Sequence, residues 1–436
     1  LHNSRLFSNV TLYYSNFNYA LGTDEQTQAF SWKSNIRDLG AKLDLNYYIN
    51  PSNTLSFGYQ LIRHQFNPGM VRSEGEGSVV AGLELERAHA LEHAAYVSNE
   101  QRIGTRFTAT YGLRVSMFQN VGSKTIYTYD EDHQVNDTLH YGRGEVYNTS
   151  INLEPRIGLR YGVNELSSVK ASYNRTAQYL HLASNGLSSS PFDVWFPSSP
   201  NVKPQLADQV ALGYFRNIHG DRWELSVETY YKVMHNAIDF RDNAQLFLND
   251  NLEAELRFGT AWSYGLEVLL RKQTGRFTGM VGYTLARTER RIDGVNNGER
   301  YRANWDRTHD LALVGSFEIS PLWRIGANWV YQTGGAVTLP VGRFEYGGTV
   351  VPVYSARNAG RMPAYHRADL SVTKASRRNE GRRWQSEWVF SVYNLYGRKN
   401  AYAINFVQDP DDPHVTYAEK TYLFSIVPAI TYNFKF

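Results

Sequence analysis

The chain has 436 residues, with 45 Lys and Arg against 42 Asp and Glu, which gives a formal net charge of +3 at pH 7. This near-balance excludes the basic stripe of a nucleic-acid-binding protein, and no apolar run approaches the ~18 residues that a membrane helix needs. Aromatic residues nevertheless make up 14% of the chain, with 31 Tyr and 9 Trp, and there is no Cys, which is permissive for an oxidising compartment such as the periplasm.

Alternation of apolar and polar residues, the signature of half-buried strands, recurs along the whole chain. Segment 107–117 places Phe, Ala, Tyr, Leu, Val and Met on one face, and segment 223–233 alternates Trp, Leu, Val, Thr, Tyr and Val with mostly polar residues. Segments 311–319 and 323–331 repeat the pattern, and about sixteen such segments can be counted. Many exceed the ~5–6 residues of ordinary strands and match the ~9–11 residues that cross a bilayer.

The connections between these segments alternate in length. Short turns are predicted at 50–53, 99–104, 162–168, 217–221, 274–276, 320–321 and 378–382, and long polar loops near 67–82, 121–145, 183–203, 241–258, 288–305, 334–365 and 398–421. This layout is typical of a transmembrane antiparallel β-barrel with short periplasmic turns and long extracellular loops. We therefore predict an all-β fold with residues 1–436 in one outer-membrane barrel. A soluble sandwich or propeller is the alternative.

The last residues alternate up to the end of the sequence. Tyr432, Phe434 and Phe436 are expected to face lipid, while Thr431 and Lys435 and the Asn between them face the lumen. Because an unpaired strand edge is not tolerated in hydrocarbon, this C-terminal strand is predicted to close the barrel.

Several stretches in a fixed order carry a family resemblance. They are EPRIGLRY at 154–161, KASYNRTAQYLHLASN at 170–185, PFDVWFPSSPNVKPQLADQVALGY at 191–214, SYGLEV at 263–268, GYTLART at 282–288, WDRTHD at 305–310 and RNAGRMPAYHRADL at 357–370. Together they resemble the barrel of a TonB-dependent outer-membrane receptor of the Bacteroidetes type, over residues 83–436.

That resemblance implies a 22-stranded barrel around an N-terminal plug, with a short periplasmic box that engages TonB. This sequence has room for about sixteen strands and contains neither plug nor box, so it is expected to be the C-terminal part of a longer receptor. The implied function is TonB-dependent import of a scarce nutrient, which is a metal chelate, a glycan or a peptide. A non-transporting scaffold or adhesin, completed by a partner or lacking a working plug, and a passive porin are the alternatives.

The implied partners are outer-membrane lipid, the receptor's own plug, TonB and the small-molecule, glycan or peptide substrate. A surface lipoprotein over the loops is left open, and no nucleic acid is expected. The implied location is the Gram-negative outer membrane.

Aromatic and charged residues in the long loops are the candidate substrate-binding residues. Exposed aromatic side chains are costly unless they meet a ligand, a headgroup or another loop, and loop-to-loop packing is the alternative reading. Basic and aromatic groups together suit an anionic chelate or a glycan. The candidates are Tyr179, His181, Asp193, Trp195, Phe196, Arg302, Trp305, Tyr354 and Arg357.

No pattern predicts an enzyme, a cofactor or a metal site. Asp306, His309 and Asp310 invite a metal or triad reading, but on a strand Asp306 and Asp310 would share one face and His309 the other. A hydrogen-bonded cluster is the favoured interpretation. The acidic stretches 129–133 and 409–413 suit calcium by residue type, yet solvated loop charge is favoured there as well.

Overall fold

The alternating segments form one antiparallel sheet in the computed structural model. The structure describes all residues except 1–4, 24–29, 74–82, 184–193, 243, 245–248, 250, 348, 380–382, 410 and 413–414. The described residues form a sheet of 18 strands, two of which, β4 (Leu83–Glu84) and β17 (Tyr301–Arg302), are only two residues long. The remaining 16 strands (18 minus 2) agree with the predicted number.

The long strands follow one another around the wall, each antiparallel to the next. They are β1 (Leu6–Thr23), β2 (Phe30–Asn50), β3 (Asn53–Ser73), β5 (Ala88–Ile103), β6 (Phe107–Val121), β9 (Val146–Asn164), β10 (Ser167–Gln178), β13 (Gln205–Ile218), β14 (Trp223–Phe240), β15 (Leu256–Lys272), β16 (Phe277–Ile292), β18 (His309–Ser320), β19 (Trp323–Gln332), β24 (Tyr365–Ala375), β25 (Gln385–Tyr393) and β28 (Val427–Lys435).

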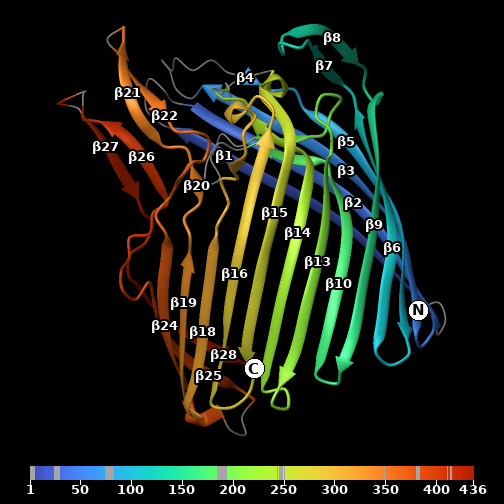
Figure 1. The fold of residues 1–436 in the computed structure, drawn as a ribbon, viewed down its shortest axis with the longest axis vertical. Helices are drawn as coiled ribbons and strands as arrows, with labels where there is room; N and C mark the ends of the chain where they lie inside the picture. Colours follow the sequence, from blue (N-terminus) through green and yellow to red (C-terminus); the bar gives the residue numbers. More distant parts are fainter. Residues whose placement is uncertain are drawn as a thin grey trace.

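Short turns and long loops lie at opposite ends of the wall, as predicted (Figure 1). The second of the predicted turns needs a small correction, because β5 continues to Ile103 and its turn covers 104–106 rather than 99–104. The wall curls so that β1, β2 and β3 pass behind the front strands β13 to β16 (Figure 1). No helix in the described part of the chain is long and apolar enough to cross a membrane.

Most long loops contain small elements of their own, which the sequence pattern did not predict. Four hairpins or bridges lie outside the main sheet: β7 (Lys124–Tyr129) with β8 (Val135–Tyr141), β11 (Leu180–Ala183) with β12 (Val194–Pro197), β21 (Pro340–Tyr346) with β22 (Thr349–Tyr354), and β26 (Ala403–Gln408) with β27 (Thr416–Thr421). A fifth pair joins β20 (Ala336–Val337) to β23 (Gly360–Arg361). Short 3-10 turns are η1 (Leu252–Glu255), η2 (Asn296–Gly298) and η3 (Arg377–Asn379).

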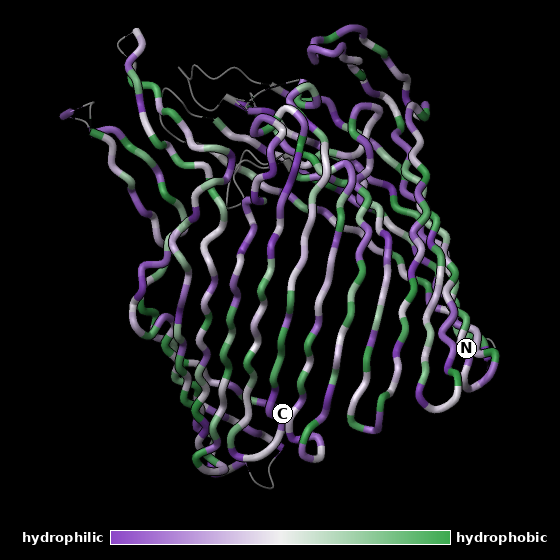
Figure 2. Tube along the Cα trace, viewed as in Figure 1, coloured by the Kyte–Doolittle hydropathy of each residue, from purple (hydrophilic) through white to green (hydrophobic). Residues whose placement is uncertain are grey.

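The outer face of the wall is apolar. The register places Leu43 beside Tyr59, Tyr59 beside Ala95, Ala95 beside Val115 and Val115 beside Leu153. These side chains share one face because directly paired residues point to the same side of a sheet. Leu153 is 57% exposed, which is unfavourable in water and favourable against acyl chains. Figure 2 shows the alternation of hydrophobic and hydrophilic residues along the strands.

The inner face carries charged side chains that are paired with one another across neighbouring strands. His64 Nδ1 lies 2.8 Å from Asp38 Oδ1, and its Nε2 lies 3.4 Å from Glu92 Oε2. Arg114 continues the chain of contacts to Glu92 at 3.6 Å and to Glu154 at 3.4 Å. A polar interior beneath an apolar exterior is the arrangement of an outer-membrane barrel rather than of a soluble sandwich.

The two outermost strands each have one edge without a partner in the described residues. β28 pairs only with β25, and β1 pairs only with β2. Tyr432 and Phe434 do lie on the outer face, where Tyr432 packs on Trp388 at 4.8 Å between ring centroids and Trp384 packs on Phe434 at 5.8 Å. Phe436 lies one residue beyond the end of β28. The barrel-closing role of these aromatic residues stays a prediction.

The assignment of faces is testable with one pair of substitutions. Leu212→Arg places a charge on the outer face of β13 and is expected to lower the free energy of unfolding by about 2–4 kcal/mol. Gln209→Arg, on the inner face of the same strand, should cost much less. Urea unfolding of the protein in lipid vesicles measures both changes, and equal costs would contradict the assigned faces.

Candidate functional site

Tyr179 fastens the β11–β12 hairpin to the inner wall, and His181 joins the two arms of this hairpin. Tyr179 is buried, its ring stacks on Phe118 at 4.9 Å, and its hydroxyl hydrogen-bonds with Ser116 at 2.8 Å. His181 Nε2 lies 2.9 Å from Ser198 Oγ. Burial lowers the pKa of His181 to about 4, so the imidazole is neutral at pH 7. Both side chains have satisfied partners, which fits the packing interpretation better than ligand binding.

Beside this hairpin is a cavity of about 300 Å³, here called the β7–β12 cavity. Its aromatic lining includes Tyr127, Tyr129, Tyr147, Trp195 and Phe196. Glu253, one of three glutamates in the lining, accepts hydrogen bonds from Ser199 Oγ at 2.8 Å and Asn201 Nδ2 at 2.6 Å. Burial and the charge of Glu253 both raise the pKa of Tyr129, so this phenol stays protonated and able to donate.

A second cavity, here called the Asp239 cavity, has a volume of about 590 Å³. Asp239 points into it because of a β-bulge in β14, where the register shifts between His235 and Ala237. The extra residue, Asn236, has φ +55°. Asn tolerates this left-handed conformation better than most residues, and a bulge reverses which side the following residues face. Without the bulge, Asp239 would face outward.

Asp239 is the shared acceptor for three donors. Arg357 Nη2 donates to Oδ1 at 2.7 Å, Arg290 Nη1 to Oδ2 at 3.2 Å, and the Tyr301 hydroxyl to Oδ2 at 2.7 Å. Asp239 is only 8% exposed. Charge-assisted hydrogen bonds of this kind are stronger than neutral ones, so the cluster ties the 334–365 loop to the ends of β14 and β16.

A further set of contacts fastens the same loop. Arg361 donates to Asp306 Oδ2 at 2.5 Å, and Asn358 Nδ2 donates to the Arg302 carbonyl at 2.8 Å. Asp306 also accepts from the Thr288 backbone N–H at 2.6 Å. The predicted hydrogen-bonded role of Asp306 is therefore confirmed, and Asp306 lies just before β18, which begins at His309. Among the described residues, no group of three His, Cys, Asp or Glu could hold a metal ion.

The predicted site residues fall into two separate groups. Tyr179, His181, Trp195 and Phe196 lie around the β11–β12 hairpin, and only the last two line its cavity. Tyr354 and Arg357 line the Asp239 cavity. Trp305 lies under the Arg290 guanidinium at 4.4 Å, and Arg302 contributes its backbone. Asp193 lies outside the described residues.

Sequence reasoning missed the acids at the centre of each group, Asp239 and Glu253, and it missed Arg290. Asp239 ends an alternating strand, where a single acid reads as a solvated rim charge. Glu253 stands in a polar loop without periodicity. A clue existed only for Arg290, which occurs in the run of charges ARTERRID at 286–293.

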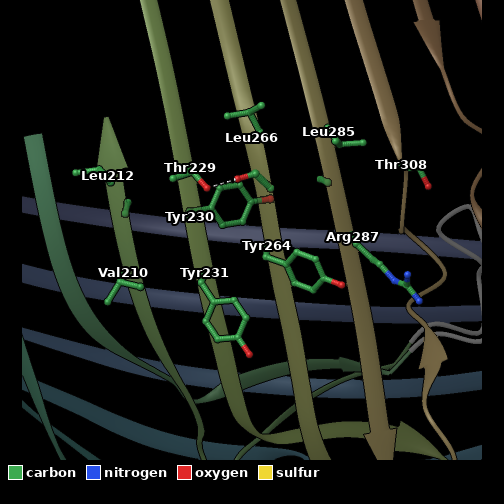
Figure 3. Close-up of a pocket in the computed structure, with 13 residues that line it drawn as sticks. Val210, Leu212, Thr229, Tyr230, Tyr231, Tyr264, Leu266, Leu285, Arg287 and Thr308 are labelled. Atoms are coloured by element: carbon green, nitrogen blue, oxygen red, sulfur yellow. Dashed lines mark hydrogen bonds between the residues drawn. The ribbon is translucent and has the colours of Figure 1, made fainter. Parts of the chain in front are cut away.

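A third depression lies on the outer face and is not part of these sites. This outer hollow has a volume of about 670 Å³ and is lined by Val210, Leu212, Thr229, Tyr231, Tyr264, Leu266, Leu285 and Arg287, among others. Figure 3 shows the rings of Tyr231 and Tyr264 on neighbouring strands, with Arg287 beyond them. Their register places them on the lipid side of the wall, so the hollow faces acyl chains.

Comparison with known proteins explains this architecture. Residues 2–395 match the family described as TonB dependent receptor-like, beta-barrel. The chain belongs to this family. Its location is the outer membrane, and TonB-dependent receptors are not enzymes, in agreement with the expectation of no catalytic residue. A comparison with curated protein sequences finds no match.

Solved receptors share the fold at low sequence identity. Fiu, the ferric-catecholate import receptor of E. coli K12, superposes with a TM-score of 0.61 at 14% identity over 99% of this chain and 62% of its own. BauA, the ferric preacinetobactin receptor of Acinetobacter baumannii, superposes with a TM-score of 0.63 at 12% identity, over 100% of this chain and 61% of its own. FecA, a ferric citrate transporter, superposes with a TM-score of 0.63 at 14% identity, over 100% of this chain and 60% of its own. The chain thus spans about three fifths of their length.

Two acids beside the same arginine provide a test of the Asp239 cluster. Asp239→Ala removes a buried shared acceptor and is expected to lower the free energy of unfolding by about 3 kcal/mol. Asp242→Ala is the control, because Asp242 is half-exposed and lies 3.9 Å from Arg357, and it should cost less than about 1 kcal/mol. Urea unfolding compares the two, and equal costs would count against the cluster.

The buried His181 predicts a pH dependence. Its pKa in the folded state is about 4, below the ordinary value of 6.5, so the unfolded chain binds more protons between these values. Stability should therefore fall as the pH falls from about 6.5 to about 4. Thermal unfolding at pH 7.5 and pH 4.5 measures this, and His181→Gln should reduce the difference. An unchanged difference would rule out His181 as its source.

Proposed function

We propose that the receptor to which this chain belongs imports a scarce nutrient across the outer membrane, using energy transmitted by TonB. In this proposal the chain forms the barrel wall and the substrate-capturing loops, and no covalent chemistry occurs. The single observation that carries the proposal is the family match over residues 2–395 together with a wall that is apolar outside and polar inside.

The loop end supports substrate capture. The β7–β12 cavity and the Asp239 cavity both lie among the long loops, and both combine aromatic side chains with charged groups. Binding sites are concave, with a few convergent polar groups among apolar ones. The candidate ligand-facing side chains are Trp195, Phe196, Tyr354 and Arg357, whereas Tyr179 and His181 hold the hairpin in place.

The strand pairing of β1 and β28 supports a longer receptor, because within the described residues β1 pairs only with β2 and β28 only with β25. An unpaired edge is not stable in hydrocarbon, so both edges require strands beyond the described wall. We infer that further strands and a plug complete the barrel, as in the predicted 22-stranded arrangement. Three similar structures are iron-chelate receptors by their names, which makes a ferric chelate the first substrate class to test, with glycans and peptides following.

The decisive test uses the full-length receptor in living cells. Deleting the segment that contacts TonB should abolish accumulation of the radiolabelled nutrient while leaving its binding to whole cells intact, because capture by the loops needs no energy. Unchanged accumulation would refute import driven by TonB. Steady conductance of the purified receptor in planar bilayers would instead favour a passive pore.

A further inference from the structure

The Asp239 cavity holds more positive than negative charge at its centre. Two guanidinium groups, from Arg290 and Arg357, share the single carboxylate of Asp239. Asp242 approaches Arg357 only to 3.9 Å and is half-exposed, so solvent screens it. Among the described residues that line the cavity, Asp239 is the only carboxylate, so the second positive charge is countered only by the distant, solvent-screened Asp242.

Arg290 also has an unused donor. Its Nε is buried and has no hydrogen-bond partner among the described residues, and Arg290 lines the cavity. One face of its guanidinium is covered by the Trp305 ring at 4.4 Å. A buried N–H without an acceptor is costly, so the geometry favours an acceptor that arrives with a ligand. An anionic oxygen would supply both the acceptor and the missing charge.

An apolar cleft between two hairpins lies beside the cavity. This space, here called the hairpin cleft, has a volume of about 880 Å³ and lies between β21–β22 and β26–β27, which project at the long-loop end (Figure 1). Pro340, Tyr354 and Phe406 line both the cleft and the Asp239 cavity, so the two spaces adjoin.

The rest of the cleft wall is mainly apolar. It includes Val350, Pro352, Val407 and Val415. Arg343 Nη1 donates to Thr416 Oγ1 at 3.3 Å and bridges the two hairpins. A ligand reaching from the cleft to Arg290 would thus meet an apolar environment along its body and a cationic one at its end.

We propose that the hairpin cleft and the Asp239 cavity form one binding site for an amphiphilic organic anion, with its carboxylate or equivalent oxyanion at Arg290 and Arg357 and its apolar part between the hairpins. This inference rests on the proposed function, because it names the chemical class of the substrate. A neutral glycan would not compensate the excess positive charge of the cavity, and a cation would be repelled by it.

Two probes of the same shape test the charge requirement. 4-Phenylbutyrate carries a carboxylate at the end of an apolar body, and 4-phenyl-1-butanol has the same body without the charge. Isothermal titration calorimetry on the purified full-length receptor in lipid nanodiscs should give a dissociation constant for the carboxylate at least tenfold lower than for the alcohol. Equal affinities, or no detectable binding of the carboxylate, would overturn the proposal.

Neighbouring arginines on opposite faces of β16 provide the matched control. Arg290→Gln should weaken binding of phenylbutyrate at least tenfold and remove the preference over the alcohol. Arg291→Gln should leave both unchanged, because Arg291 is exposed and its Nε donates to the Gly298 carbonyl at 3.3 Å. An Arg290→Gln variant that retains wild-type affinity would refute the site.

A third variant covers the case in which Arg290→Gln fails to fold, as judged by loss of heat-modifiable migration on a gel. Phe406→Ala shortens a side chain shared by both spaces and should weaken both probes at least threefold while keeping the preference for the carboxylate. Unchanged binding of both probes would overturn the proposal. These binding measurements need no TonB. A negative binding result would therefore not contradict the import proposal, and uptake that does not depend on TonB would not contradict the anion site.

Discussion

Backbone hydrogen bonding in hydrocarbon is the constraint on which the whole structure depends. No water is present there to satisfy N–H and C=O groups, so every strand that crosses the membrane needs a partner along both edges. The long antiparallel ladders from β2 to β25 meet this demand, and the register then decides which side chains face lipid. The same constraint applies to β1 and β28, each of which pairs with a single neighbouring strand in the described part of the wall.

The residues that face lipid determine which residues face the interior of the wall. Leu43, Tyr59 and Leu153 face lipid, so the residues that alternate with them along the same strands must face inward. Charges on this inner face are stable only when they are paired. Glu92, Arg114 and their neighbours are paired across strands for this reason. At the long-loop end the same principle operates in the loops, where Arg357 and Arg361 bind acids on other elements and hold the 334–365 loop in position over the wall.

Sequence patterns predicted binding residues by type but could not say which of them have partners. Trp195 and Arg357 do line cavities. Tyr179 is aromatic like Trp195, but its ring packs on Phe118 and lines neither of these two cavities. Asp239 was missed because its inward direction depends on the bulge at Asn236, and one inserted residue has no signature in an alternating pattern. Contacts between loops far apart in sequence were equally invisible.

The sequence by itself determined the fold class, the number of wall strands, the alternation of turns and loops and the family, because period-2 patterns and ordered motifs are local properties. Only the tertiary structure decided which loop residues meet. The Asp239 cluster joins residues 118 positions apart, Asp239 and Arg357, and the hairpin cleft exists because two separate loops fold back as hairpins that project side by side. Such meetings depend on the register and bulges of the whole sheet, which no single segment encodes.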